Sequence, residues 1–235
     1  MKRELQLQPR LACIASLVPR GSVLADVGTD HGYVPVYLLR AGAITRAIAS
    51  DIGREPLEHA RRTAEEYGVG GIDFRLCAGL AGIAPEECDT IVIAGMGGET
   101  MMEILSAAPW TRGGAHTLLL QPQTKIEELR LWLCEHGYAV TRETLVEDKG
   151  KLYIVMTVTA GEAFTPDAVQ LFGGLALEHD ALCGVYLAQQ IARLRRRADG
   201  LRQGSGDREA EAAGLSALAD ALERKKGKWE HDNGI

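Results

Sequence analysis

Short apolar runs alternate with amphipathic stretches along the chain as far as Thr159. The apolar runs are flanked by turn residues, which is typical of buried parallel strands, and they are Val23–Asp26, Ala47–Asp51, Ile72–Leu76, Thr90–Ala94 and Thr117–Leu120. The amphipathic stretches predict helices at Leu11–Val18, Val34–Ala41, Pro56–Tyr67, Glu99–Ala107 and Lys125–His136. This repeated alternation predicts an α/β sheet that is covered by helices on both faces.

The alternation ends at two strand-like runs, Tyr138–Val146 and Leu152–Thr159, which have no helix between them. Their connection, Glu147-Asp148-Lys149-Gly150, is short and polar, so the pair predicts an antiparallel hairpin. Five parallel strands closed by such a pair are typical of methyltransferases that use S-adenosylmethionine, whereas an all-parallel dinucleotide fold has no such pair.

The pattern after Ala160 is purely helical. A narrow apolar seam is formed by Leu187, Ile191, Leu194, Ala198 and Leu201, is interrupted by Gly204-Ser205-Gly206, and resumes with Leu215, Leu218, Leu222 and Trp229. We therefore expect an α/β domain over residues 1–160 and a coiled-coil-like hairpin of two helices over residues 161–235. The hairpin either packs on the main domain or binds a partner.

The composition indicates a globular protein of a reducing compartment. Apolar residues make up 46% of the chain and charged residues 25%, which is ordinary for globular proteins. The five cysteines are odd in number and form no Cys-x-x-Cys pair, so we expect neither a disulfide framework nor a metal site. No apolar run approaches the roughly 18 to 20 residues that a membrane span needs. We expect a cytoplasmic protein with no membrane association; its oligomeric state stays open, and a monomer fits.

Glycines and carboxylates are interleaved in the turn after the first predicted strand, Asp26-Val27-Gly28-Thr29-Asp30-His31-Gly32-Tyr33. Gly28 and Gly32 allow a ligand to approach the backbone closely. A dinucleotide fingerprint would have glycines where Asp30 and Tyr33 stand. Because Asp30 would repel a diphosphate and attract a sulfonium and an ammonium group, the turn favours S-adenosylmethionine and makes a nicotinamide oxidoreductase the weakest alternative.

Two more carboxylates lie at strand ends. Asp51 comes 23 residues after Gly28, at a position where a carboxylate accepts hydrogen bonds from both hydroxyls of a ribose. A surface turn or a helix cap is the alternative role for Asp51. Asp26 lies within an apolar strand, where a carboxylate is costly without a partner, and we expect it to accept hydrogen bonds from loop amides.

The fourth predicted strand runs into a second glycine-rich turn, Ala94-Gly95-Met96-Gly97-Gly98, which we interpret as a ligand-facing edge. It has no Asn-Pro-Pro or Asp-Pro-Pro motif, which methyltransferases acting on exocyclic amines use there. Neither Cys77 nor Cys88 has the Pro-Cys setting of a carbon-directed nucleophile. A ring nitrogen such as adenine N1 has its lone pair in the ring plane, so it needs positioning more than a base.

Taken together, these motifs resemble the bacterial tRNA adenine-22 N1-methyltransferases. The resemblance rests on Ala25–Pro35 and Ile93–Gly98, and on Leu119–Pro122, Arg130–Leu133 and Glu147–Tyr153. It implies a Rossmann-like class I methyltransferase sheet with a C-terminal helical domain, S-adenosyl-L-methionine as cofactor and tRNA as substrate. Two positions depart from the family: Ala78 stands where an Asp usually binds the cofactor's adenine, and Gln123 stands where Asn is usual.

The resemblance and the chemistry of the side chains imply the following roles. For catalysis we expect Asp30, Tyr33, Gly95 and Met96. For cofactor binding we expect Asp26, Gly28, Thr29, Asp30, His31, Gly32, Asp51, Ile52, Ala78, Gly79, Leu80, Ala94 and Gly95. For tRNA binding we expect Gly97, Gln121, Gln123, Tyr153, Arg193, Arg196 and Arg197, with Arg195, Arg202, Lys125 and Arg130 as further phosphate contacts.

Several alternatives stay open. His31 is equally a structural histidine, and the arginines are equally a solvated helix face on a chain of net charge −6. The acceptor is alternatively another RNA or a small nitrogen heterocycle, because cofactor motifs carry no information about it. Ala78 leaves room for a non-catalytic RNA-binding or partner-binding protein that retains the pocket.

Overall fold

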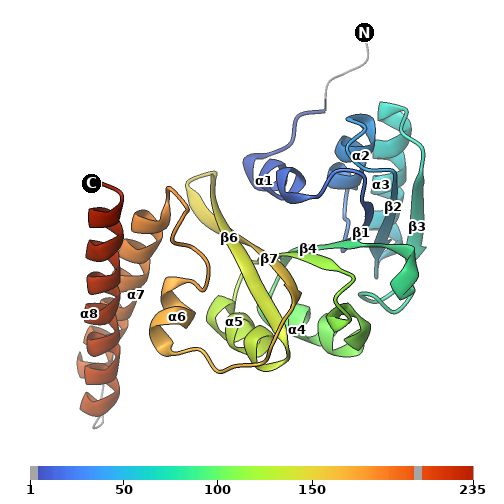
Figure 1. The fold of residues 1–235 in the computed structure, drawn as a ribbon. Helices are drawn as coiled ribbons and strands as arrows, with labels where there is room; N and C mark the ends of the chain where they lie inside the picture. Colours follow the sequence, from blue (N-terminus) through green and yellow to red (C-terminus); the bar gives the residue numbers. More distant parts are fainter. Residues whose placement is uncertain (1–4, 204–207, 235) are drawn as a thin grey trace. The chain divides into compact units, whose positions relative to one another are not determined.

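The computed structural model describes residues 5–203 and 208–234 and divides into two compact units, residues 1–164 and 165–235 (Figure 1). The first unit extends past the predicted boundary at residue 160 because backbone hydrogen bonds hold the following residues. The amide of Gly161 donates to the carbonyl of Gly137 at 3.0 Å, and the amide of Phe164 donates to that of Cys134 at 3.0 Å.

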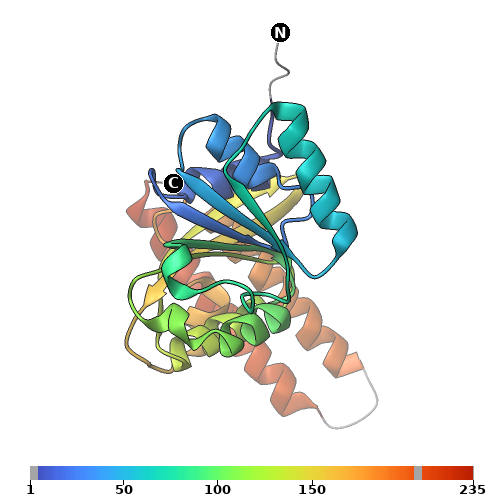
Figure 2. The same ribbon diagram turned by 90° about the vertical axis from the view of Figure 1, so that its right-hand side faces the viewer.

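A seven-stranded sheet forms the centre of the first unit, with the strand order β3-β2-β1-β4-β5-β7-β6 (Figures 1 and 2). The strands are β1 (Val23–Val27), β2 (Arg46–Asp51), β3 (Ile72–Leu76), β4 (Thr90–Met96), β5 (Thr117–Pro122), β6 (Tyr138–Asp148) and β7 (Lys151–Ala160). β1 to β5 are parallel, and β7 runs antiparallel to both β5 and β6. The predicted fold class, five parallel strands closed by an antiparallel hairpin, is confirmed.

The hairpin is tighter than its sequence suggested. Lys149 and Gly150 both have positive φ, +50° and +73°, so the connection is a two-residue turn; β6 extends into the predicted connection as far as Asp148, and β7 begins at Lys151. Such a turn suits the right-handed twist of the paired strands.

Helices cover both faces of this sheet, with α1 to α3 on one face and α4 and α5 on the other (Figure 2). The bounds of the helices are α1 (Pro9–Leu17), α2 (Tyr33–Arg40), α3 (Arg54–Tyr67), η1 (Pro85–Glu87), α4 (Gly98–Ala107), η2 (Pro109–Arg112) and α5 (Ile126–Glu135). In α1 and α2, Ile14 and Leu38 pack with Leu24 and Val92 of the sheet. Burial on both faces explains the continuous apolar runs of the central strands.

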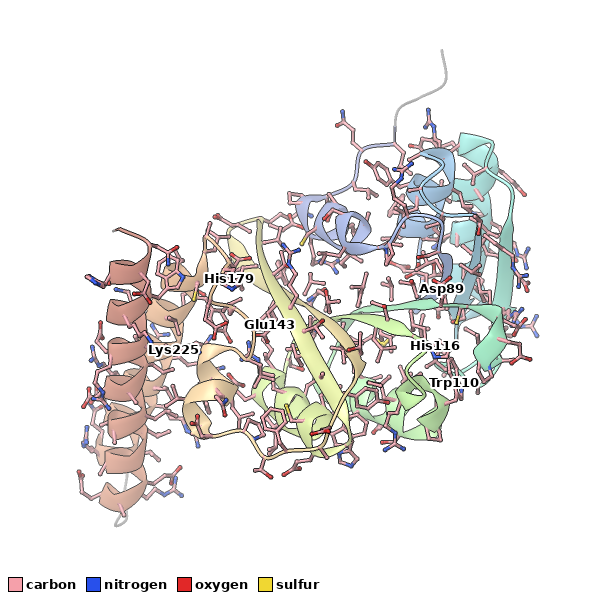
Figure 3. The ribbon with its side chains drawn as sticks, viewed as in Figure 1. Asp89, Trp110, His116, Glu143, His179 and Lys225 are labelled. Carbon is pink, nitrogen blue, oxygen red and sulfur yellow. The ribbon has the colours of Figure 1, made fainter. Side chains whose placement is uncertain are left out.

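The amino ends of the strands carry polar contacts that are structural. Asp89, just before β4, accepts a hydrogen bond from the amide of Val23 at 3.0 Å. Just before β5, His116 Nε2 lies 2.9 Å from the carbonyl of Pro85, and its ring meets Trp110 edge-on at 4.8 Å. Asp89, Trp110 and His116 lie in one region of the unit (Figure 3).

The second unit contains α6 (Ala168–Gly173), α7 (Cys183–Gln203) and α8 (Glu209–Asp232). α7 and α8 pair as antiparallel helices, as the apolar seam predicts; Leu187, Leu194 and Leu222 are buried. The predicted turn at Gly204-Ser205-Gly206 lies outside the described residues.

The expectation of a purely helical region after Ala160 is wrong. Residues 161–167 are not helical, and the short helix α6 was not foreseen. Asp167 caps α6 by accepting from the amide of Gln170 at 2.8 Å, and Gly173 and Gly174 end it. Within residues 5–203 and 208–234, no helix has the length and apolar character of a membrane span.

Candidate active site

A cavity of about 820 Å³ lies at the carboxyl ends of β1, β2 and β4 in the first unit. It sits where the strand order reverses between β1 and β4, the place where parallel α/β sheets bind ligands. Its walls come from the N-terminal segment and α1, from the turns after β1, β2 and β4, and from helices α2 and α3. The lining residues are Leu5, Gln6, Leu7, Gln8, Arg10, Leu11, Asp26, Gly28, Thr29, Asp30, His31, Tyr33, Val34, Asp51, Tyr67, Val92, Ala94, Gly95 and Met96.

The turn after β1 is held to the neighbouring strand by its backbone. The amides of Gly28 and Thr29 both donate to the carbonyl of Ser50 on β2, at 2.8 and 3.0 Å. Gly28 and Gly32 have φ of +70° and +66°, and Asp30 adopts the same left-handed region at +51°. The chain therefore coils tightly around the mouth of the cavity, which requires glycine or a residue as tolerant as Asp.

Conformation requires both glycines of this turn, and packing against Ala60 adds a second requirement at Gly32, whereas at Gly28 the end of the flexible Met96 side chain would have to move. A Cβ on Gly28 would overlap the methyl group of Met96, and one on Gly32 would lie 2.9 Å from the Cβ of Ala60 on α3. Gly28 thus joins the two glycine-rich turns, because its missing side chain makes room for the residue that ends β4.

Asp26 is buried and has a single described hydrogen-bond donor, the hydroxyl of Thr29 at 2.6 Å. Burial raises the pKa of Asp26 to about 6, against the lowering effect of the Thr29 hydrogen bond, and the negative charge of Asp51 adds to the increase. The partner of Asp26 is therefore a hydroxyl and not the loop amides expected from the sequence. This carboxyl group holds a negative charge at neutral pH but is poorly solvated, so a cationic ligand would be favourable beside it.

Asp51 instead accepts from loop amides. Its Oδ1 receives the amide of Gly53 at 2.9 Å, and its Oδ2 receives the amide of Asp30 at 3.4 Å. Asp51 therefore connects the turns after β1 and β2 and remains half-buried in the cavity wall. Asp26, Asp30 and Asp51 together make this end of the cavity negative.

His31 stacks on two other rings. Its imidazole stacks on Tyr33 at 5.3 Å and on His59 of α3 at 5.0 Å, with interplanar angles of 18° and 7°. Nitrogen and oxygen atoms of Asp30, His31 and His59 lie within 4.8 Å of one another. Because ring-nitrogen lone pairs lie in the ring planes, two parallel stacked imidazoles do not converge on one ion, so this arrangement favours an aromatic stack. No local sequence pattern indicated that His59 joins this stack.

The turn after β4 is shaped by contacts to β5 and α5. Gly95 has φ of +77°, and the amide of Gln123 donates to the carbonyl of Met96 at 2.8 Å. A Cβ on Gly98 would lie 2.6 Å from the carbonyl of Lys125, and one on Gly97 would lie 3.1 Å from Thr124 Oγ1. Gly95 and Met96 line the cavity, whereas Gly97 and Gly98 allow close packing against the α5 loop.

Gln121, at the end of β5, is fully buried beneath this turn. Its Oε1 accepts from Arg10 Nη1 at 2.6 Å, from the amide of Gly95 at 3.2 Å and from Gln123 Nε2 at 3.2 Å. Its own Nε2 donates to the carbonyl of Pro122 at 3.0 Å. The structure thus places Gln121 under the site as a support for Gly95, and Gln123 is exposed above it.

Arg10 is a lining residue that the sequence did not reveal. It stands in the first turn of α1, is half-buried, and its guanidinium lies 5.7 Å from the centre of the Tyr153 ring on β7. The residues Arg10 and Gln121 are 111 positions apart, so no local pattern could indicate their contact. Tyr153 is half-buried at the same edge of the site.

The predicted cofactor residues after β2 and β3 lie outside the cavity lining. Ile52 is 79% exposed, and Ala78 is exposed as well. Leu80 is buried, and a Cβ on Gly79 would lie 2.9 Å from Ile104 of α4, so the segment after β3 is anchored by packing. Ile52 and Ala78 remain available to a ligand, whereas the side chain of Leu80 is part of the core.

Arg130 and Lys125, the two phosphate contacts predicted beside the pocket, differ in burial: Arg130 lies in the core and Lys125 on the surface. Arg130 is fully buried in an ion pair with Glu143, with Nε and Oε1 2.7 Å apart, so its proposed role as a phosphate contact is wrong (Glu143 is labelled in Figure 3). Lys125 is exposed and pairs with Glu128 at 3.2 Å. Arg130 fixes α5 to β6 instead, and breaking such a buried pair typically costs about 3–5 kcal/mol.

The predicted arginines of the second unit lie on the exposed surface of α7. Arg197 pairs with Glu211 of α8 at 3.2 Å, Arg193 lies over the ring of Phe172 at 5.4 Å, and Arg196 is exposed. Exposed ion pairs contribute roughly 0–1 kcal/mol, so a phosphate could replace Glu211 at little cost.

The buried cysteines are poor nucleophiles. Burial raises the pKa of the Cys88 and Cys134 thiols to about 11, so both are protonated at neutral pH. Neither lines the cavity. This agrees with the missing Pro-Cys motif and leaves the site without covalent catalysis by these residues.

Comparison with known protein families independently shows what this chain is similar to. A family model described as a methyltransferase domain matches residues 7–156. A tRNA (adenine(22)-N(1))-methyltransferase of Bacillus subtilis is 37% identical over 188 residues, which are 80% of this chain and 77% of that protein.

Two solved structures match the fold of this chain over nearly its whole length. The crystal structure of the B. subtilis m1A22 tRNA methyltransferase covers 93% of this chain and 99% of its own, with 30% identity and a TM-score of 0.82. A Streptococcus pneumoniae protein crystallised in complex with S-adenosyl-L-methionine covers 91% of this chain and 97% of its own, with 29% identity and a TM-score of 0.80.

Proposed function

This chain belongs to the family of tRNA (adenine(22)-N(1))-methyltransferases, and we propose that it transfers a methyl group from S-adenosyl-L-methionine to N1 of adenine 22 in tRNA. One observation in the structure carries the proposal. A single cavity joins a glycine turn rich in carboxylates to a second glycine turn without charged side chains. The first suits a cationic cofactor, and the second leaves room for a flat neutral base.

The described residues fit S-adenosylmethionine. Asp26 and Asp30 supply negative charge for its sulfonium and ammonium groups, and Asp51 supplies a carboxylate at the position that binds ribose hydroxyls. The exposed side chain of Ile52 and the small Ala78 border the place expected for its adenine. When bound, the cofactor supplies an electrophilic methyl group.

Positioning is the main task of the protein in this reaction. Adenine N1 attacks with an in-plane lone pair, so no general base has to remove a proton first. Gly95 and Met96 form a floor held from below by Gln121, and Tyr33 borders the opening next to His31. The base becomes positively charged as N1 is methylated, and we assign the stabilisation of that charge to Asp30.

The tRNA has to deliver a base that is normally stacked in a folded region. Turning it out costs a few kcal/mol, which contacts to phosphates must offset. We assign part of this role to Arg193, Arg196 and Arg197 on α7. Since tRNA is the proposed substrate, we propose that the protein works in the cytoplasm.

The test is an assay with an unmodified tRNA transcript and labelled S-adenosylmethionine, followed by mapping of reverse-transcription stops. We expect one stop at adenine 22 and none in a transcript with guanine at that position. Methylation at a different base or only of other RNAs would replace the proposed acceptor. Cofactor binding without methylation of any RNA would identify a non-catalytic binding protein.

A further inference from the structure

We propose that Arg10 binds a backbone phosphate of the tRNA strand that carries the target adenine. The proposal deepens the proposed function and rests on it. No sequence motif or assigned role includes Arg10, which lines the cavity from the first turn of α1.

The position of Arg10 is fixed at the end of the site where the base is expected. Its Nη1 lies 2.6 Å from Gln121 Oε1, and a Cβ on Gly95 would lie 3.7 Å from the same nitrogen. The guanidinium also lies over the ring of Tyr153. Two separate elements, β5 and β7, therefore hold its planar group beside the neutral glycine turn.

Most of the donor capacity of this guanidinium is not needed for that anchoring. An arginine carries five N–H donors in a fixed planar arrangement, and the bond to Gln121 uses one of them. The side chain is half-buried and borders the cavity. A held guanidinium of this kind matches the geometry of a phosphate, which it can bind through two parallel hydrogen bonds.

The charge distribution around the cavity gives the phosphate a reason to bind there. Asp51 and Asp26 come from β2 and β1, on the other side of β4 from the β5 and β7 residues that Arg10 contacts, and together with Asp30 they would repel an RNA backbone. Among the lining residues within the described ranges 5–203 and 208–234, Arg10 alone is a permanent cation. An anionic strand entering the site is therefore directed to the Arg10 end, which leaves the acidic end for the cofactor.

A structural role is the competing explanation, since Arg10 also fixes Gln121. The two roles differ in their response to salt. A phosphate contact releases counterions, so its loss lowers the slope of log affinity against log salt by about 0.7 to 0.9. Loss of a purely structural contact weakens binding or turnover without changing that slope.

The experiment compares wild type with Arg10→Gln, which removes the charge and keeps an amide donor for Gln121. Arg10→Lys keeps the charge, and Arg20→Gln is the matched control. Arg20 is exposed and precedes β1, so it lies at the end of that strand away from the cavity. Binding of tRNA is measured by filter retention between 50 and 300 mM salt, and binding of S-adenosylmethionine by calorimetry.

We expect Arg10→Gln to weaken tRNA binding about five- to tenfold at low salt and to lower the salt slope by about 0.7 to 0.9. Arg10→Lys and Arg20→Gln should keep the wild-type slope, and all variants should bind the cofactor normally. An unchanged slope in Arg10→Gln would overturn the proposal, even if turnover fell. If Arg10→Gln failed to bind cofactor, Arg10→Met would replace it in the same comparison. Failure of wild type to methylate tRNA would count against the proposed function instead.

Discussion

The turns after β1 and β4 have similar backbones and different electrostatic surroundings. Each places a glycine at positive φ in the cavity wall, Gly28 at +70° and Gly95 at +77°. The first turn is bordered by three carboxylates, and one of them, Asp26, is buried. The second is bordered by Gln121 beneath it and by the cation of Arg10.

The comparison shows that glycine lets a ligand come close to the backbone of a turn. The charges of the neighbouring side chains decide which ligand binds there. A negative site attracts a sulfonium and rejects RNA phosphates, whereas a neutral site next to an arginine accepts a base and its backbone. We propose that the two turns in this way separate a cationic cofactor from an anionic RNA strand within one cavity.

The strongest test of the acidic turn is Asp30→Asn. Asn tolerates the left-handed backbone that Asp30 adopts at φ +51°, so the change removes charge and leaves the shape. We expect single-turnover methylation to slow about 100-fold, as for other lost electrostatic stabilisers, with a modest loss of cofactor affinity.

Glu162→Gln is the matched control for Asp30→Asn. Glu162 is an exposed carboxylate of the first unit outside the cavity lining, and its neutralisation should leave the rate unchanged. A wild-type rate in Asp30→Asn would remove Asp30 from the reaction.

Substitution of the glycines should have the next largest effect and should differ between the two turns. Alanine at Gly28 would overlap the Met96 methyl group and would adopt a left-handed conformation that costs about 1–2 kcal/mol. We expect Gly28→Ala to weaken cofactor binding, measured by calorimetry, about tenfold or more.

Gly95→Ala is the comparison variant. It shares the positive φ, but its Cβ would meet only the flexible Arg10 side chain at 3.7 Å, so the cofactor should bind within about threefold of wild type. Equal losses in the two variants would show that backbone strain alone, and not the contact with Met96, governs the first turn.

The difference between the turns also marks what sequence could predict. The β1 turn is a local strand-turn-helix unit and Asp51 ends the next strand, so spacing alone could predict that Gly28, Asp30 and Asp51 border one cavity. The parallel strands and the closing hairpin followed from the alternation of strands and helices and its end at Tyr138, whereas the strand order comes from the structure alone. Long-range contacts carry no such signal, and Arg10 and His59 were therefore missed.

Burial is the other property that the sequence did not show. Arg130 was expected beside the pocket because it is basic, but Glu143 on β6 neutralises it within the core. Leu80 was assigned to the cofactor because it follows β3, yet its side chain is 3% exposed. Charge and position along the chain do not show which way a side chain points.

The pH dependence of cofactor binding tests the charge of the acidic turn more gently. Since the pKa of Asp26 is about 6, its carboxyl group takes up a proton as pH falls below neutrality and loses its attraction for a cation. We expect cofactor affinity, measured by calorimetry, to fall about fourfold between pH 7.5 and 5.5. Asp26→Asn should remove most of this dependence, and His31→Gln should retain it. A dependence that survives in Asp26→Asn would assign it to another group.

Stability without cofactor should change in the opposite direction, because protonation of Asp26 at low pH favours the folded protein. The raised pKa means that the folded protein holds this proton more tightly than the unfolded chain. The stabilising contribution of the Asp26 proton to the free energy of unfolding is therefore full below pH about 4 and is lost as pH rises to about 6. Above that pH the contribution no longer changes. Asp26→Asn should raise the midpoint of thermal unfolding at pH 7.5 and have little effect at pH 4; the opposite order would contradict the assigned cause.

The smallest expected effect concerns positive charge outside the cavity. Arg193, Arg196 and Arg197 are exposed on α7; Arg197 already pairs with Glu211 and Arg193 lies over the Phe172 ring, so the phosphate contacts they make compete with existing weak surface interactions. Changing all three to Gln should weaken tRNA binding about threefold and leave turnover at saturating tRNA unchanged. Arg224→Gln on α8 is the control for loss of charge on the same unit. A larger loss than in Arg10→Gln would mean that affinity resides mainly on the second unit, and that the Arg10 end of the cavity orients the RNA more than it holds it.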